Sequence, residues 1–209
     1  MKINKEFRSP NHYVAFATPP KILVIHATAA DTWNSTKHWF LNPQSKASSH
    51  YVIDKNGDIY QMVDESKPAW HAGYSKWKGK EGLNWHSIGI ELVNDSHKPY
   101  PEAQIAAVIE LSKDIMSRLE IDKEDVVRHS DISGYRGKTD PYSHFPWDRF
   151  KKSLTSNKMT NYDILEVIKE WKCEDEVKWA EEKKIISDRR ILTIEQLKTT
   201  IMLHRYHNR

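Results

Sequence analysis

The first 150 residues alternate between short apolar runs and longer segments in which apolar residues recur at helical spacing. Runs that are apolar throughout, or that alternate between apolar and polar residues, are typical of strands. Such runs predict strands at 21–26, 48–54, 59–63, 87–93 and 126–129. The second and third are separated by Asn56-Gly57, a pair that favours a tight hairpin turn.

Two segments carry helical periodicity. Apolar side chains at steps of three and four follow Pro101 and continue to Leu119, which predicts a long helix that packs on the sheet. A shorter helix is predicted at 32–41. Residues 64–86 show no clear periodicity and are interpreted as a loop. Strands interspersed with helices indicate an α/β domain over residues 1–150.

The pattern changes after residue 150. Residues 151–160 are polar, lack a hydrophobic pattern and are interpreted as a linker. Residues 161–209 contain three short apolar stripes at helical spacing, which predict a small helical domain. The last of these helices begins with a capping-box sequence, Thr193-Ile-Glu-Gln196.

Composition and charge narrow the classes of function. The net charge is +3, and all of this excess lies in residues 151–209, which hold 13 basic and 10 acidic residues. No stretch forms a basic stripe, so a nucleic-acid partner is not expected. No apolar run approaches the roughly 20 residues that a membrane helix needs, so no membrane partner is expected. The N-terminal residues carry no apolar secretion signal and Cys173 is the single cysteine, so synthesis in a reducing cytoplasm is expected.

Two of the predicted strands end in histidine. His26 closes the first strand, His129 closes the last, and Asp140 follows on the next loop. If these strands are neighbours in one sheet, all three side chains reach the same edge, and two imidazoles with one carboxylate are a common catalytic zinc set. A buried structural histidine is the alternative for His26 alone. Glu91 lies in an otherwise apolar strand, which indicates either a salt bridge at the rim or a functional group that faces a cleft.

Six short segments follow one another in an order that resembles a known family, and Phe-Pro-Trp147 comes after them. The segments are His26-Ala-Thr, Ser49-His50-Tyr51, Trp70-His71-Ala72-Gly73, Ser87-Ile-Gly-Ile-Glu91-Leu, Arg128-His129-Ser-Asp-Ile and Lys138-Thr-Asp140-Pro141. This order resembles the zinc-dependent N-acetylmuramoyl-L-alanine amidases of the type-2 amidase and peptidoglycan-recognition-protein superfamily. The resemblance covers about residues 20–150.

The resemblance implies a mixed central sheet flanked by helices, and it implies roles for five residues. The implied zinc ligands are His26, His129 and Asp140. The implied catalytic pair is Glu91 and Lys138. Zinc makes hydroxide available near neutral pH. The glutamate would accept the water proton and pass it to the leaving amine, while the lysine ammonium would stabilise the oxyanion.

Other residues are assigned less definite roles. Trp70 and His71 are expected to form a wall for the substrate, and His50 is expected either to contact substrate or to be structural. Asp131 would either orient a metal-binding imidazole or cap its loop. The family's usual Asp-Pro-Gly ends here in Tyr142, which predicts a different shape for the loop after the third ligand.

The reaction that the resemblance implies is hydrolysis of the amide bond between N-acetylmuramic acid and L-alanine in bacterial peptidoglycan. The separate tail favours a phage-type endolysin, which a holin would release to the cell wall. A cytosolic amidase that recycles soluble wall fragments and a recognition protein that only binds peptidoglycan are the alternatives. The helical tail at 161–209 is interpreted either as a wall-binding module or as an extension that packs on the catalytic domain or forms a homodimer.

Overall fold

The computed structural model describes residues 1–154 together with residues 175 and 178. The chain divides into two compact units, 1–154 and 155–209. The predicted helical domain at 161–209, with its proposed wall-binding or dimerisation role, therefore lies outside the described residues apart from two positions. Within the described part, no helix combines the length and the apolar character needed to cross a membrane.

A six-stranded sheet forms the centre of the first unit. Its strand order is β1-β4-β3-β7-β2-β8, and β3 pairs with β4 antiparallel while all other neighbours are parallel. The strands are β1 (Ile3–Asn4), β2 (Ile22–Ala27), β3 (Tyr51–Ile53), β4 (Ile59–Gln61), β7 (Ser87–Leu92) and β8 (Val126–Arg128). The mixed sheet that the resemblance implied is confirmed, as is the hairpin around Asn56-Gly57.

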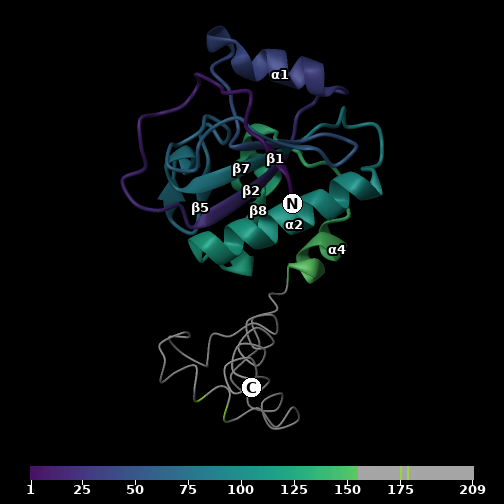
Figure 1. Cartoon of the computed structure of the whole chain (residues 1–209). Helices are drawn as coiled ribbons and strands as arrows, with labels where there is room; N and C mark the ends of the chain where they lie inside the picture. Colours follow the sequence, from purple (N-terminus) through teal and green to yellow (C-terminus); the bar gives the residue numbers. More distant parts are fainter. Residues whose placement is uncertain (155–174, 176–177, 179–209) are drawn as a thin grey trace, which may run out of the picture. The chain divides into compact units, whose positions relative to one another are not determined.

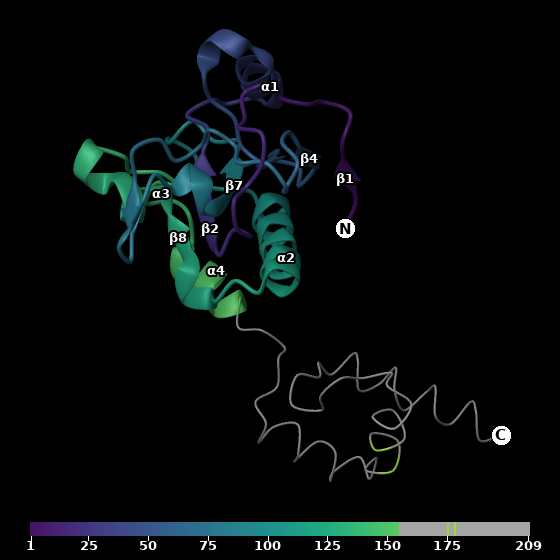
Figure 2. The same ribbon diagram turned by 90° about the vertical axis from the view of Figure 1, so that its left-hand side faces the viewer.

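Helices cover both faces of this sheet (Figure 1). The long helix α2 (Glu102–Leu119) and the short α4 (Trp147–Ser153) lie on one face, and α1 (Trp33–Leu41) lies on the other (Figures 1 and 2). The fourth helix, α3 (His129–Ser133), follows β8 directly. The side chain of Thr32 caps α1 by accepting a hydrogen bond from the Ser35 amide at 3.2 Å.

Strands β2 and β7 are buried on both faces, which explains why most of their residues are apolar. Because side chains alternate along a strand, Leu23 and Ile25 point into the main core beneath α2, whereas Val24 packs in a second cluster on the opposite face. Ile88, Ile90 and Leu92 of β7 join the main core. The opposite face of the same strands therefore remains available for Gly89, Glu91 and His26.

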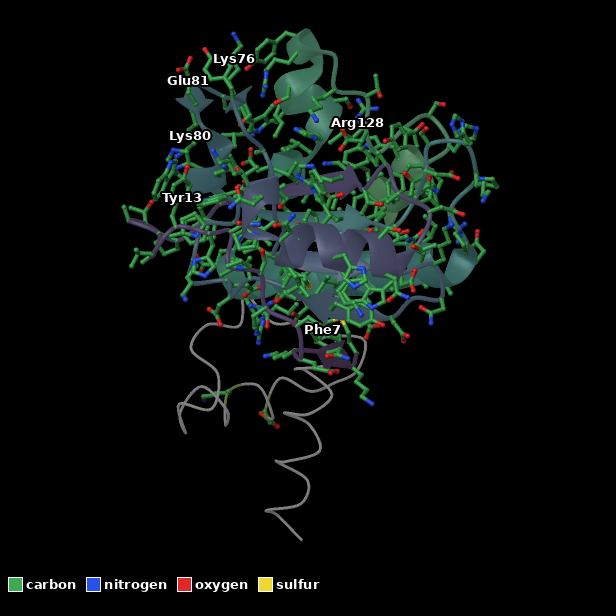
Figure 3. All side chains as sticks on the ribbon, turned by 90° about the horizontal axis from the view of Figure 1, so that it is seen from above. Phe7, Tyr13, Lys76, Lys80, Glu81 and Arg128 are labelled. Atoms are coloured by element: carbon green, nitrogen blue, oxygen red, sulfur yellow. The ribbon has the colours of Figure 1, made fainter. Side chains whose placement is uncertain are left out.

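Three elements differ from the sequence-based expectation. The predicted loop at 64–86 contains a small exposed hairpin, β5 (Lys76–Trp77) with β6 (Lys80–Glu81), whose Lys76, Lys80 and Glu81 lie at the edge of the molecule (Figure 3). His129 begins α3 rather than ending β8. Helix α4 also continues past the predicted domain end at residue 150, because Phe150 and Leu154 are both buried in the main core.

The core position of α4 gives a stability prediction. Phe150 is fully buried, and its ring centroid lies 5.4 Å from those of Phe145 and Trp147. Replacing it in Phe150→Ala should leave a cavity and lower the free energy of unfolding by about 3–5 kcal/mol. Val14→Ala, at a side chain that is 89% exposed, is the control and should change it by less than about 0.5 kcal/mol. Urea unfolding of the full chain measures both, and equal midpoints would contradict the placement of α4 in the core.

Candidate metal centre

Parallel pairing brings the two strand-end histidines together. In β2 and β8, Ile25 is the register partner of Arg128, so His26 and His129 come next at the same edge of the sheet. Asp140 returns to this edge, and one ligand atom from each of the three side chains lies within 4.8 Å of the others. His129 Nδ1 is 3.0 Å and His26 Nδ1 is 3.5 Å from Asp140 Oδ2. The three residues predicted to bind a metal therefore form one buried group.

The loop that carries Asp140 is held by hydrogen bonds to α3 and to β2. The Asp140 carbonyl accepts from the Ser130 amide at 3.0 Å, and its carboxylate accepts from the Ala27 amide at 3.4 Å. Tyr142 follows with φ of 52°, a conformation that favours glycine. The left-handed turn is thus present although the residue is tyrosine, and the side chain adds an aromatic wall to the adjacent pocket.

Buried nitrogens test whether these residues suit a metal. His26 Nδ1 and His129 Nε2 are both buried and have no hydrogen-bond partner among the described residues. Burial, reinforced by the neighbouring His129, lowers the pKa of His26 to about 4, which leaves a neutral imidazole at pH 7. Burial alone would raise the pKa of Asp140, but the hydrogen bond with His129 and the proximity of His26 lower it below its usual range. The neutral imidazole of His26 beside an ionised carboxylate fits a zinc-type ion.

Glu91 stands beside this group because of strand register. It is the direct partner of His26 across the parallel β2–β7 pair, so both side chains point to the same face. The residue is 9% exposed, and its Oε2 has no hydrogen-bond partner among the described residues. Burial raises the pKa of Glu91 well above its usual value, the negative charge of Asp140 raises it further, and Lys138 opposes this rise. Such a carboxyl group is suited to proton exchange near neutral pH.

A pocket of about 470 Å³ opens onto these residues. Glu91, His129 and Asp140 lie at its base, and the exposed Lys138 also lines it. The pocket is completed by Ala27, Thr28, Ala29, Ala30, Ser35, Thr36, Trp39, Phe40, Ala47, Ser48, Trp70, His71 and Tyr142. The volume is within the range of ligand-binding clefts.

Two of the expected substrate contacts have other partners. His50 is fully buried, does not line the pocket, and bonds through Nε2 to the Lys67 carbonyl at 3.0 Å and through Nδ1 to the Gly89 amide at 2.9 Å. The expected substrate contact of His50 is therefore wrong, and the structural alternative fits. His71 reaches the pocket wall, yet its Nδ1 lies 2.9 Å from His26 Nε2.

The alternative roles of Asp131 are resolved by its hydrogen bonds. Its carboxylate accepts from the Arg128 amide at 2.9 Å and pairs with the Arg128 guanidinium at 2.8 Å. These contacts belong to the capping box of α3. Asp131 therefore caps its loop, and within residues 1–154 its carboxylate has no hydrogen bond to an imidazole.

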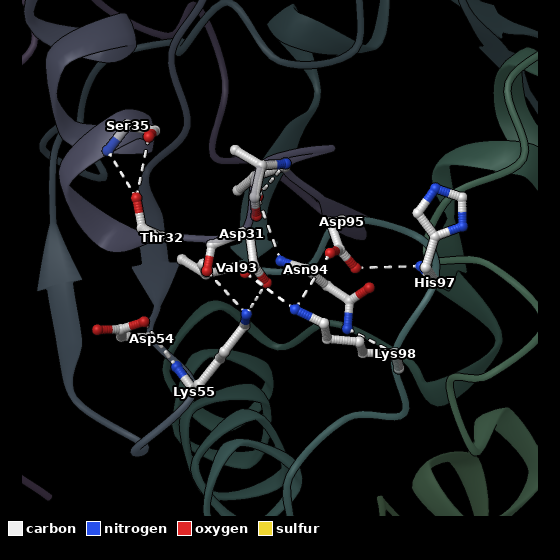
Figure 4. Close-up of polar contacts among 12 residues, drawn as sticks. Asp31, Thr32, Ser35, Asp54, Lys55, Val93, Asn94, Asp95, His97 and Lys98 are labelled. Atoms are coloured by element: carbon white, nitrogen blue, oxygen red, sulfur yellow. Dashed lines mark hydrogen bonds and ion pairs between the residues drawn. The ribbon is translucent and has the colours of Figure 1, made fainter.

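One wall of the pocket is fixed by an exposed ion-pair cluster around Asp31 (Figure 4). The Asp31 carboxylate accepts hydrogen bonds from Lys55, on the β3–β4 turn, and from Lys98 at 3.0 Å. Thr28 Oγ1, on the same loop as Asp31, accepts from the Asn94 amide at 3.3 Å. The loop after β2, which lines the pocket, is thereby tied to two neighbouring loops.

Sequence reasoning missed Trp39 and Tyr142 as pocket residues. Trp39 is 57% exposed although it is a large aromatic residue on α1. Its position outside the apolar stripe of the predicted helix was the available signal, because an exposed tryptophan near a cleft often contacts ligands. Tyr142 gave a weaker signal, as the residue in the place of the expected glycine.

Comparison with known proteins supports an amidase relationship. A family described as N-acetylmuramoyl-L-alanine amidase matches residues 16–143. The N-acetylmuramoyl-L-alanine amidase AmiD of Escherichia coli K12 is 43% identical over 145 residues, which are 62% of this chain and 51% of AmiD. The 1,6-anhydro-N-acetylmuramyl-L-alanine amidase AmpD of Haemophilus influenzae is 41% identical over 53% of this chain and 60% of its own length. The chain thus spans between about half and three fifths of these relatives.

Solved structures agree with this relationship. A selenomethionine derivative of AmpD superposes with a TM-score of 0.66 at 28% identity, covering 73% of this chain and 94% of AmpD. AmiD from E. coli was solved in complex with anhydro-N-acetylmuramic acid-L-Ala-D-gamma-Glu-L-Lys. It superposes with a TM-score of 0.61 at 36% identity, covering 76% of this chain and 65% of the AmiD chain. The endolysin LysCS from Clostridium intestinale superposes with a TM-score of 0.60 at 25% identity, covering 73% of this chain and 95% of LysCS.

The family match contains every residue of the candidate metal centre and the buried Glu91 beside it. On this basis, the chain belongs to the N-acetylmuramoyl-L-alanine amidase family.

Proposed function

We propose that this chain hydrolyses the amide bond between N-acetylmuramic acid and L-alanine, with zinc held by His26, His129 and Asp140. One observation carries the proposal: within the family match, a buried group of two histidines and an aspartate adjoins a buried glutamate, and three of these four residues line a single pocket. A protein that only binds peptidoglycan has no need of these groups, and burying unpartnered polar atoms costs stability.

Each residue has a chemical role in this reaction. A zinc ion held by His26, His129 and Asp140 would supply Lewis acidity, which lowers the pKa of a water molecule and polarises a carbonyl group. Glu91 accepts the proton of the attacking water and then donates it to the leaving amine of L-alanine, a task suited to its raised pKa. The Lys138 ammonium stabilises negative charge that develops on the carbonyl oxygen. Trp39 and Trp70 line the pocket, and their proposed role is to contact the sugar or the stem peptide.

Soluble anhydromuropeptides are the proposed substrate class. Several relatives are named 1,6-anhydro-N-acetylmuramyl-L-alanine amidases, and AmiD was solved with an anhydromuramyl tripeptide. These names favour recycling of wall fragments over lysis of intact wall. The similarity to the endolysin LysCS supports the second candidate, an endolysin that reaches the wall after release from the cytoplasm.

The first test compares the two substrate classes directly. The full chain should release new L-alanine amino termini from anhydromuramyl peptides faster than from insoluble cell walls. A chelator should abolish release, and added zinc should restore it. Mass spectrometry of the products identifies the bond that is cut. Absence of release from either substrate by the zinc-loaded protein would refute the amidase proposal, whereas faster release from walls would favour the endolysin.

The second test concerns Glu91. Glu91→Gln keeps the size of the side chain but removes its capacity to exchange a proton, so kcat should fall by at least about 100-fold. Bound zinc, measured by atomic absorption, should stay at the wild-type level because Glu91 is not among the proposed ligands. Glu81→Gln, in the exposed strand β6, is the matched control and should keep full activity. A fully active Glu91→Gln enzyme would show that another group moves the proton.

A further inference from the structure

A chain of buried hydrogen bonds runs behind His26, away from the pocket. His26 Nε2 lies 2.9 Å from His71 Nδ1. His71 Nε2 lies 3.3 Å from Ser87 Oγ, which in turn lies 2.6 Å from the Leu83 carbonyl oxygen. Ser87, Leu83 and His26 are fully buried and His71 is 9% exposed, so solvent has little access to these hydrogen bonds.

The direction of each hydrogen bond follows from its last member. A carbonyl oxygen only accepts, so the hydroxyl proton of Ser87 is donated to Leu83. Ser87 Oγ then has only lone pairs left for His71, whose Nε2 must carry the ring proton. In a neutral His71 ring, Nδ1 is consequently an acceptor, and it accepts from His26 Nε2–H.

The surroundings of His71 favour this neutral ring. Its centroid lies 5.0 Å from that of His26 and 5.6 Å from that of His50, and no carboxylate among the described residues is bonded to it. His50 already has both ring nitrogens engaged with backbone groups. A second proton on His71 would sit on Nδ1 and point at His26 Nε2–H, so His71 could no longer accept the hydrogen bond from His26.

We propose that His71, anchored through Ser87 to the Leu83 carbonyl, is a positioning residue that fixes the Nε2–H tautomer of His26. This tautomer leaves the Nδ1 lone pair of His26 directed at Asp140, 3.5 Å away, where a metal ion would bind. The benefit to metal binding rests on the proposed function, whereas the tautomer itself does not. His71 thus acts through His26, although the sequence suggested a direct substrate contact.

Gly89 supplies the space that this arrangement needs. A Cβ atom built at Gly89 would lie 2.6 Å from both Cγ and Nδ1 of His71, closer than real Cβ contacts allow. Glycine normally weakens a strand, so its occurrence within β7 calls for a reason, and close approach of a ring is one. The His71 ring lies against the backbone of β7 because residue 89 has no side chain.

Nitrogen NMR of the full chain, labelled in histidine and freed of metal, tests the tautomer directly. At neutral pH, His26 should show a protonated Nε2 and an unprotonated Nδ1, and His71 should show the same pattern. A proton on Nδ1 of His26 would overturn the proposal. This result does not depend on turnover, so it stands apart from success or failure of the amidase assay.

Variants of His71 test the consequence for metal binding. His71→Phe keeps a ring but removes the acceptor, and it should mix the tautomers of His26 and weaken zinc affinity by about 10–100-fold in chelator competition. His71→Asn can place an oxygen where Nδ1 was, and it should recover much of that affinity. The exposed His97 gives the matched control, His97→Asn, which should bind zinc as the wild type does.

Zinc affinity in folded His71→Phe equal to that of the wild type would overturn the positioning role. If His71→Phe does not fold, Ser87→Ala is the deciding variant, because it removes only the hydroxyl that anchors His71 at the far end of the hydrogen-bond series. It should also shift His26 towards mixed tautomers and weaken zinc binding, and an unchanged tautomer and affinity would refute the proposal. A wild-type chain with the expected tautomer that binds zinc but hydrolyses nothing would leave this inference standing and reject the proposed function.

Discussion

Parallel pairing of β2 with both β7 and β8 is the constraint on which the site depends. The pairing with β7 sets His26 opposite Glu91, and the pairing with β8 brings His129 to the same edge. The register is held by apolar side chains on both faces, with Leu23 and Ile25 on one and Val24 on the other. A slip of one residue would turn all of these side chains to the wrong face, so core packing and site geometry enforce one another.

The two faces of the sheet have different roles. The face under α2 and α4 is mostly apolar and supplies most of the buried hydrophobic surface. The other face carries ionisable side chains, and burial keeps His26, His50 and His71 neutral by lowering their pKa values. Burying neutral rings with hydrogen-bond partners costs far less than burying charges. A polar site is therefore compatible with a stable fold because the other face is mostly hydrophobic.

The sequence was informative where local pattern determines structure. Apolar runs predicted the strands, and the positions of His26 and His129 at their ends predicted that these residues meet. It was less informative where tertiary contacts decide. The surroundings of His50 come from segments far away in the chain, and burial of Leu154 after several polar residues depends on the main core rather than on periodicity. The conformation of Tyr142 is likewise set by its neighbours, since a tyrosine alone would not predict a left-handed turn.

The three candidate ligands come from positions 26, 129 and 140, and the first described unit ends at residue 154. During synthesis, a growing chain that has presented His26 lacks both other ligands until nearly the whole unit has been translated. Before that stage, His26 is the only one of the three candidate ligands that the growing chain contains. The candidate metal site is therefore assembled only after β8 has joined β2 and Asp140 has been translated.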